Sequence, residues 1–449
     1  MGSCGVDGVH IVSRRMVRPS TLPTAANGGH PPKDEAEEGI LQPKPPTSGD
    51  RLVAILAASL ARALGRFYPF AARLAAQERG DGTVTVSLRC TSDGAELVHA
   101  TAPGVAVADI ADSLYTPPVV RSFFSFNEVL DGDAAFESLP VLSVQVTELA
   151  DGVFVAMSMN HSVGDGTTFW DFFNTWSEIS RGGASGELSS PAPVLQRWFL
   201  ETREQPRADP HAVRQAAPPP PAVRAANRAG ILLHLLRGER QEAQGDGKRR
   251  DGHGHGHHLL APGPPRAPLA SPFPGPMPAT GAEHDLLHDH RVPRARGRCG
   301  ILPGYVGNAL VRSEVRSTAG EIERNGLGWT AWQLNRAVAS FDEARVRDWL
   351  GRWVLEPEFA HMGSAMSDGA AVTTGSSPRF DVFGNDFGWG KPVAVRSGAA
   401  EKMDGATTVF EGREKGGSIS LVVCAREGVL ARLVDDKEFM DATSLPARA

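Results

Sequence analysis

Val153-Phe-Val-Ala-Met-Ser-Met-Asn-His-Ser-Val-Gly-Asp-Gly-Thr-Thr-Phe-Trp-Asp-Phe-Phe-Asn-Thr-Trp176 is the stretch of the chain that decides its fold. Its first half alternates large apolar residues with small or polar ones, which predicts a buried strand. Its second half places aromatic residues at three- and four-residue spacing, as a helix with one buried face does, and we expect them to pack in the core. The turn between the halves contains glycines that let the backbone bend. A histidine at the end of a buried strand is well placed to act as a base, so His161 is the candidate catalytic residue.

Length, composition and charge favour a globular protein with more than one domain. The chain has 449 residues, of which 41% are hydrophobic and 22% charged; this allows two or three domains with a core each. A net charge of −6 gives no global reason to expect nucleic-acid binding. The four cysteines are scattered and form neither a disulfide framework nor a metal pattern. Because we find no signal segment and no apolar run as long as a membrane span, we expect a cytosolic protein.

The patterns of residues 1–200 predict one α/β domain. Strands are expected at residues 9–17, 83–88, 96–99 and 142–149, with the second and third of these paired to each other. Residues 18–49 are rich in proline, glycine and acidic side chains and suggest a loop or a disordered segment. Asp50 is a candidate N-cap, and apolar residues at helical spacing follow it to about Gly65, which predicts a helix.

Residues 201–300 differ from the rest of the chain. They are rich in proline, histidine and arginine, and their apolar patterns extend over only a few residues, as at 231–236. A structureless stretch of this length is unusual inside a compact domain. Two interpretations remain open: a low-complexity linker, or a stretch written in the wrong reading frame.

The reading-frame hypothesis can be examined with the genetic code over residues 254–270. If GC-rich codons are assumed and reading starts one base later, the same bases can encode Ala-Thr-Ala-Thr-Ile-Ser-Ser-Leu-Gln-Ala-Leu-Leu-Ala-His-Leu-Trp. That string has a serine cap followed by apolar residues at helical spacing, which the written sequence lacks. The histidine cluster at 253–258 could otherwise suggest metal binding. Under this hypothesis it is an accident of frame, and we expect no metal site.

Regular patterns return near Ile301. Residues 303–309 predict a turn that enters a strand or helix, residues 327–349 predict a helical region, and residues 430–440 predict a terminal helix. Strands are expected at residues 379–382, 393–395 and 418–424. Residues 301–449 are therefore assigned to the remainder of a second α/β domain, after the aberrant segment 201–300.

The chemistry of His161 gains support from motifs elsewhere in the chain. His161-x-x-x-Asp is followed by glycine, and Asp386-Phe387-Gly388-Trp389-Gly390 lies far downstream. This pair resembles the two signatures of the plant BAHD acyltransferases, which move acyl groups from coenzyme A thioesters to alcohols or amines. Tyr305-Val306-Gly307-Asn308 resembles a third, weaker motif of that family. Tyr68-Pro-Phe-Ala-Ala-Arg-Leu74 is similar to the stretch after the family's first long helix.

The resemblance implies a fold of two chloramphenicol-acetyltransferase-like domains with mixed sheets and an active-site channel between them. It implies that His161 is the general base and that Asp165 turns away from the cleft to pair with an arginine, while Gly166 lets the backbone pass close by. Residues 386–390 would be structural, with glycines in a tight turn, Trp389 in a core and the aspartate paired with an arginine. Acyl-CoA would be a co-substrate, with no bound cofactor or metal, and the protein would be a monomer.

Arg379 is a candidate for binding the acceptor. It lies seven residues before Asp386, as does an arginine that holds the acceptor's carboxylate in hydroxycinnamoyl transferases of the family. An arginine fork suits a carboxylate, so the acceptor would then be an acid. A solvated or structural arginine is the alternative interpretation.

Three functions remain open at this point. The first is acyl transfer to the hydroxyl or amine of a small plant metabolite. The resemblance is closest to a branch of uncharacterised acetyltransferases that also contains a salicylate-pathway lyase, so a lyase using the same pocket without an acyl donor is the second. The chain departs from the family in residues 201–300 and in lacking a Thr-Pro-Trp-Asp type sequence after the first strand. The third is therefore a non-catalytic product of a damaged or wrongly assembled gene.

Overall fold

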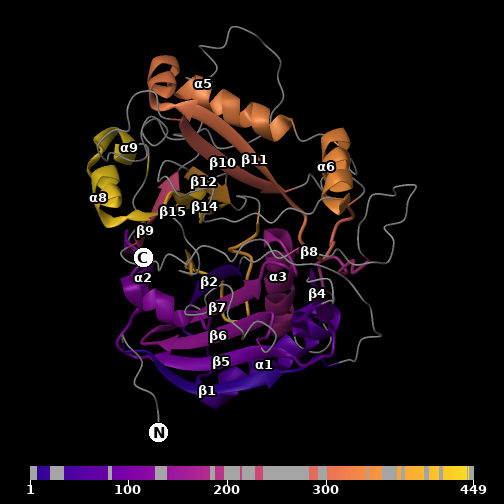
Figure 1. Cartoon of the computed structure of the whole chain (residues 1–449). Coiled ribbons are helices and arrows are strands. Elements are labelled where there is room, and N and C mark those ends of the chain that lie inside the picture. The colour runs from indigo at the N-terminus through magenta and orange to yellow at the C-terminus, as the bar shows by residue number, and fades with distance from the viewer. Residues whose placement is uncertain are drawn as a thin grey trace.

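The computed structural model of the chain describes residues 8–20, 35–78, 83–126, 139–182, 188–196, 213–214, 228–235, 283–291, 301–340, 343–355, 372–375, 380–398, 404–413, 418–441 and 443. These residues form two lobes, each built on a six-stranded sheet (Figure 1). Each sheet contains both parallel and antiparallel neighbours. The expectation of an α/β fold with two domains and mixed sheets is confirmed.

The first sheet has the strand order β1-β5-β6-β7-β2-β13. Its strands are β1 (His10–Val17), β2 (Glu35–Pro43), β5 (Ala95–Ala102), β6 (Leu142–Leu149), β7 (Gly152–Asn160) and β13 (Ala394–Ser397). Only β5 and β6 run parallel to each other. β7 lies between β6 and β2, and every residue of it except the last is buried. The predicted central strand is therefore present, and it ends at the turn that carries His161.

Two helices cover one face of this sheet. They are α1 (Gly49–Arg66) and α3 (Gly166–Gly182), which pack against each other. The aromatic stripe of α3 is core, as predicted, because Phe172 and Trp176 are completely buried. The N-cap of α1 is Ser48 rather than Asp50. Because Ser48 makes no side-chain cap, the Glu148 carboxylate of β6 instead accepts the first helical N–H, that of Gly49, at 3.0 and 3.1 Å.

Shorter elements complete the first lobe. α2 (Val107–Ala111) and the 3-10 helix η2 (Pro118–Phe123) cover the opposite face of the sheet. A second 3-10 helix, η1 (Tyr68–Ala71), follows α1. A separate three-stranded sheet contains β3 (Arg73–Glu78), β4 (Thr83–Arg89) and β8 (Val213–Arg214).

The second sheet has the strand order β11-β10-β12-β14-β15-β9. Its strands are β9 (Arg228–Leu235), β10 (Glu283–Arg291), β11 (Leu310–Thr318), β12 (Val372–Gly375), β14 (Ala406–Glu411) and β15 (Ile419–Arg426). The helices of this lobe are α5 (Ala319–Ala339), α6 (Glu343–Leu355), α8 (Glu427–Asp435) and α9 (Lys437–Asp441). α8 and α9 lie beside β9 and β15 (Figure 1). Apolar residues of these helices, among them Leu430 and Phe439, are buried together with residues of β9, β14 and β15. None of the helices in the described ranges has both the length and the apolar content needed to cross a bilayer.

Four expectations about the elements are corrected. The loop expected at residues 18–49 contains β2, because pairing with β7 and β13 buries Ile40 and Leu41 despite the acidic flank. Residues 83–88 do not pair with 96–99, since β4 pairs with β3 and β8 while β5 pairs with β1 and β6. The terminal helix is two short helices, α8 and α9. Residues 380–382 are not a strand.

The expected domain ranges do not divide the two sheets cleanly. β13 belongs to the first sheet although it lies within residues 301–449. β9 and β10 lie within the aberrant segment 201–300, and β9 pairs along its whole length with β15. The second half of the chain therefore contributes one strand, β13, to the sheet of the first lobe.

Candidate active site

His161 lies in the turn that follows β7. Asn160 shapes this turn, because its Oδ1 accepts hydrogen bonds from the backbone N–H of Ser162 (3.0 Å) and from the Ser162 hydroxyl (2.6 Å). The backbone carbonyl of His161 accepts a hydrogen bond from Asn308 Nδ2 at 3.0 Å. His161 itself is partly exposed. The imidazole is thus carried by a backbone that both lobes hold, and it keeps the access that a base requires.

Asp165 caps α3 and links it to the second lobe. Its side chain is completely buried. Oδ1 accepts hydrogen bonds from the backbone N–H groups of Thr167 (3.1 Å) and Thr168 (3.0 Å), which is N-cap geometry. Oδ2 accepts a hydrogen bond from the backbone N–H of Ala309 at 3.2 Å. These contacts give the aspartate a structural role, and its pairing with an arginine stays a prediction.

Glycines limit the space around this turn. Gly166 is the first residue of α3. At Gly164, on the other side of Asp165, a Cβ would lie 2.7 Å from Thr168 Cγ2. The close approach expected at Gly166 stays a prediction.

Residues 305–309 bring the third motif against the first turn of α3. Tyr305 is 7% exposed, and a Cβ on Gly307 would lie 2.8 Å from the Tyr305 ring, so glycine is needed for this packing. The carbonyl of Gly307 accepts a hydrogen bond from the backbone N–H of Asp165 at 3.2 Å. Asn308 then reaches the carbonyl of His161. The structure thus brings Tyr305, Gly307 and Asn308 together with His161 and Asp165.

Thr168 also belongs to this site, although no motif singles it out. Its hydroxyl donates a hydrogen bond to the carbonyl of Gly307 at 3.0 Å and accepts one from the N–H of Gly307 at 3.3 Å. Thr168 is completely buried and lies four residues before Phe172, on the apolar stripe of α3. A hydroxyl on an otherwise apolar helix face is the signal that could have identified it.

The Asp386–Gly390 motif packs against the other end of α3. Asp386 Oδ1 accepts hydrogen bonds from the N–H groups of Gly388 (2.8 Å) and Gly390 (3.1 Å), whose φ values of +109° and +125° favour glycine. Asp386 Oδ2 lies 3.8 Å from an Nη atom of Arg181, the basic residue in the last turn of α3. The predicted tight turn and the predicted arginine partner are therefore present. The motif is distinct from the turn that carries His161.

Phe387, rather than Trp389, is the buried anchor of this motif. Phe387 is 2% exposed, and its ring meets that of Trp176 edge to face with centroids 4.7 Å apart. Trp389 is only partly buried and stacks on Phe387. In this tight turn the backbone directs the ring of Phe387 into the core and leaves that of Trp389 partly exposed. The residue types alone do not predict which of the two rings is buried.

The crossover between the lobes, residues 188–196, packs along α3. Glu178 of α3 accepts hydrogen bonds from the backbone N–H (2.5 Å) of Ser189 and from the hydroxyl (2.9 Å) of Ser190. Partial burial raises the pKa of Glu178, but these hydrogen bonds outweigh it and leave the pKa below its usual value. Val194 pairs with Tyr305 as an isolated parallel bridge. The crossover thereby leads directly to residues 305–309.

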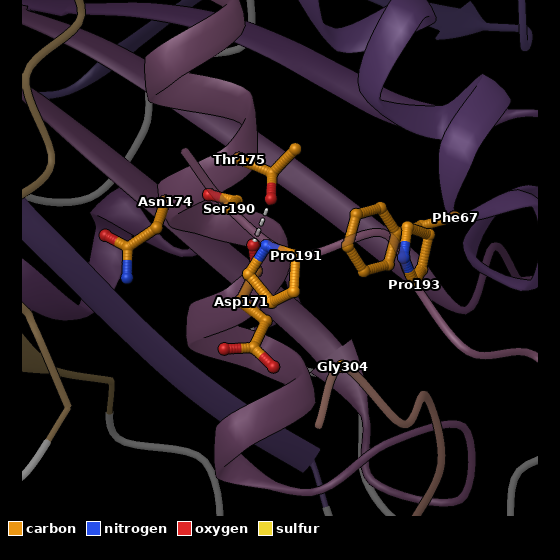
Figure 2. A pocket seen from close by; sticks show the side chains of 8 residues that line it. All are labelled: Phe67, Asp171, Asn174, Thr175, Ser190, Pro191, Pro193 and Gly304. Carbon is orange, nitrogen blue, oxygen red and sulfur yellow. Dashed lines mark hydrogen bonds between the residues drawn. The ribbon is translucent and has the colours of Figure 1, made fainter. Parts of the chain in front are cut away.

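A cavity of about 70 Å³ lies beside this crossover (Figure 2). It is lined by Phe67, Asp171, Asn174, Thr175, Ser190, Pro191, Pro193 and Gly304. Its volume has room for a few water molecules and is far too small for a coenzyme A thioester. His161 does not line it. The expected channel that would admit substrates to His161 therefore stays a prediction.

Two expectations concern residues outside the described ranges. Arg379 is one of them, so its proposed contact with an acceptor carboxylate stays a prediction. The histidine cluster at 253–258 is the other. Within the described ranges, no group of histidine, cysteine and acidic side chains has the arrangement of a metal site.

Comparison with known proteins gives a family from the sequence and a matching fold from solved structures. Residues 40–228 and 294–440 match the Transferase family. An uncharacterised acetyltransferase of Arabidopsis thaliana is 30% identical over 91% of both chains. The shikimate O-hydroxycinnamoyltransferase of Nicotiana tabacum is 25% identical over 82% of this chain and 84% of its own. TRI101 of F. graminearum, solved in complex with coenzyme A and deoxynivalenol, has a TM-score of 0.66 at 16% identity over 92% of this chain and 96% of its own.

Proposed function

Because this chain belongs to the BAHD acyltransferases of the Transferase family, we propose that it moves an acyl group from an acyl-CoA thioester to the hydroxyl or amine of a small plant metabolite. His161 is the general base in this proposal. The observation that supports it most directly is the attachment of the His161 turn to both lobes through Asn160 and Asn308. A histidine held in this way and partly exposed suits proton transfer where two substrates meet.

The reaction needs one proton to be taken from the acceptor and one to be given to the leaving thiolate, and it needs no covalent enzyme intermediate. The neutral imidazole of His161 takes the proton of the acceptor as its oxygen or nitrogen attacks the thioester carbonyl. The carbon–sulfur bond then breaks, and the leaving coenzyme A thiolate takes that proton from the imidazolium, which returns His161 to its neutral form. General base catalysis of this kind typically contributes about 10²–10⁴-fold. Asp165 has a structural role in this proposal, unlike the acid of a serine-hydrolase triad, and the hydrogen bonds that its oxygens accept from the α3 N-terminus and from Ala309 support that role.

The substrates are proposed by class. TRI101, which shares the fold, was solved with coenzyme A, and this supports acyl-CoA as the co-substrate. The relative from Nicotiana tabacum is a shikimate O-hydroxycinnamoyltransferase, which is in keeping with an acidic acceptor held by Arg379. We also propose that the protein acts as a monomer in the cytoplasm, without a bound cofactor or metal. A lyase that uses the same pocket without a donor stays the enzymatic alternative.

A second candidate is a non-catalytic product, and one observation favours it. The family match passes over residues 229–293, which include most of the Pro-, His- and Arg-rich segment. A chain with an altered segment there would keep the His161 turn and lose part of the second lobe. Sequencing the transcript across codons 200–300 separates the two: a repaired frame encoding the Leu-Leu-Ala-His-Leu-Trp helix favours the enzyme.

The experiment for the proposed function is a thiol-release assay. The purified protein is incubated with acyl-CoA thioesters and candidate acceptors, and free coenzyme A is followed with a thiol reagent. We expect acceptor-dependent release that falls by about 10²–10⁴-fold in His161→Ala. His10→Ala is the matched control, because His10 is an exposed histidine on β1. Release that is equal in His161→Ala and in the unaltered protein would remove His161 from the role of base.

A further inference from the structure

Thr168 satisfies both backbone polar groups of Gly307. A hydroxyl offers one proton and two acceptor sites, so it can donate to the Gly307 carbonyl at 3.0 Å and accept from the Gly307 N–H at 3.3 Å. Both residues are buried, so water does not replace these bonds. With the bonds from Asp165 to Gly307 and from Ala309 to Asp165, they join α3 to the second lobe. The hydrogen bonds among Asp165, Thr168, Gly307 and Ala309 are here called the clasp.

The clasp fixes a side chain that contacts the His161 turn. Asn308 lies between Gly307 and Ala309, the two clasp residues of the second lobe, and its Nδ2 donates to the carbonyl of His161 at 3.0 Å. Asn308 Oδ1 is buried and has no hydrogen-bond partner in the described part of the chain. The amide is therefore oriented by the backbone on either side of it. A shift of Gly307 would move the Asn308 amide and, with it, the carbonyl that carries His161.

The space around Thr168 restricts what can stand there. Its methyl group faces Gly164, where even a Cβ would come within 2.7 Å of it. Valine has nearly the same shape as threonine and fits this space, but it lacks the hydroxyl. Thr168→Val therefore keeps the branched shape but removes the bonds to Gly307 and the longer bond to the Tyr305 carbonyl at 3.4 Å, and Thr168→Ser keeps the hydroxyl and removes the methyl group.

We propose that Thr168 is a positioning residue for His161, acting through Gly307 and Asn308. The inference rests on the proposed function of His161 as the base. Thr168 does not touch the reacting atoms; it keeps the imidazole at the distance and angle from which it can take the acceptor's proton. Misplacement of a catalytic group by about 1 Å can cost about 10²-fold in rate. Loss of the hydroxyl should therefore lower kcat and leave the binding of substrates nearly unchanged.

The test compares Thr168→Val, Thr168→Ser and the control Thr175→Val in the full chain. Thr175 is also a buried threonine of α3, but its hydroxyl donates to the Asp171 carbonyl within the same helix at 2.6 Å. We expect Thr168→Val to lower kcat per folded molecule at least about tenfold with KM changed less than about twofold, since positioning acts on the chemical step. Thr168→Ser should recover kcat to within a few fold, and Thr175→Val should leave kcat unchanged. An unchanged kcat in Thr168→Val, or an equal fall in Thr175→Val, would overturn the proposal.

A second measurement separates failure of this inference from failure of the proposed function. Diethyl pyrocarbonate modifies accessible imidazoles, and peptide mass spectrometry gives the rate at His161 alone. We expect Thr168→Val, but not Thr175→Val, to change that rate several-fold and to speed amide exchange in residues 305–309. If the unaltered protein releases no thiol, the proposed function fails while these two readouts still decide whether Thr168 positions His161. Unchanged rates in Thr168→Val would refute the positioning role whatever the activity.

Discussion

Replacing Asp165 with alanine should destabilise the first lobe and its contact with the second. The carboxylate is completely buried, and it accepts two N–H groups at the start of α3 and the N–H of Ala309. Alanine removes all three of these hydrogen bonds at once. The helix then loses its cap, and the Ala309 N–H loses its acceptor in a region that is closed to water.

The size of the effect follows from those two losses. An N-cap aspartate is worth about 1 kcal/mol over alanine, within a range of about 0.5–2 kcal/mol. A buried donor left without a partner costs about 1–3 kcal/mol. Asp165→Ala should therefore lower the free energy of unfolding by about 2–4 kcal/mol, taking both terms together. Asp165→Ser keeps an oxygen for the cap but is too short to reach Ala309, so its loss should be about 1–3 kcal/mol.

Urea unfolding followed by tryptophan fluorescence measures these differences, since Trp170 and Trp176 are both buried on α3. Asp165→Asn is a third variant in the series. It keeps the capping oxygen and turns an amide donor toward the Ala309 N–H, so we expect it to be no more stable than Asp165→Ser. A loss below about 0.5 kcal/mol in Asp165→Ala, or equal losses in the alanine and serine variants, would refute the double role assigned to the carboxylate.

Two further predictions concern Phe387 of the Asp386–Gly390 motif and Glu411, the last residue of β14. Phe387→Ala should lower the free energy of unfolding by about 3–5 kcal/mol in urea melts, because the ring is buried against Trp176. Trp389→Ala should lower the free energy of unfolding by less. A larger loss in Trp389→Ala than in Phe387→Ala would contradict the assignment of Phe387 as the buried anchor. Burial, with a smaller contribution from Asp381, raises the pKa of Glu411 in the folded protein. The stability that Glu411 contributes is therefore fully present below its unfolded-chain pKa of 4.5, and it is lost as the pH rises through the higher folded-state pKa. Glu411→Gln should therefore raise the melting temperature at pH 7 and not at about pH 4, and a gain that is independent of pH would exclude this cause.

Local patterns in the sequence predict the elements whose burial is set within one element. β7 and α3 are examples, since large apolar residues recur along each with the period of a strand or a helix. The acidic partner in the motif at 386–390 is also predictable, because an aspartate before two glycines suits a turn. The sequence does not predict which arginine pairs with Asp386, because Arg181 comes close to it only when the motif packs on α3.

β2 shows why other elements escape prediction. Its sequence begins Glu-Ala-Glu-Glu and is followed by prolines, which favours a loop. The strand forms because β7 pairs with one edge and β13, more than three hundred residues later, pairs with the other. No local window contains both partners. The same holds for Thr168, whose polar partners lie in residues 305–307.

The motifs at residues 305–309 and 386–390 both contact α3, so the His161 site depends on distant parts of the chain. Residues 305–309 hold the first turn of α3 through the clasp, and residues 386–390 hold its last turn through Arg181 and its middle through the ring of Trp176. His161 lies just before that helix, on a turn whose carbonyl is bonded to Asn308. A first lobe alone would leave the Asp165 carboxylate and the Thr168 hydroxyl without their second-lobe partners, and burial of such groups without partners is costly. The His161 turn therefore has all of its contacts only when the second lobe is folded against α3, and a defect in residues 201–300 would act on His161 through this contact rather than through the motif that contains it.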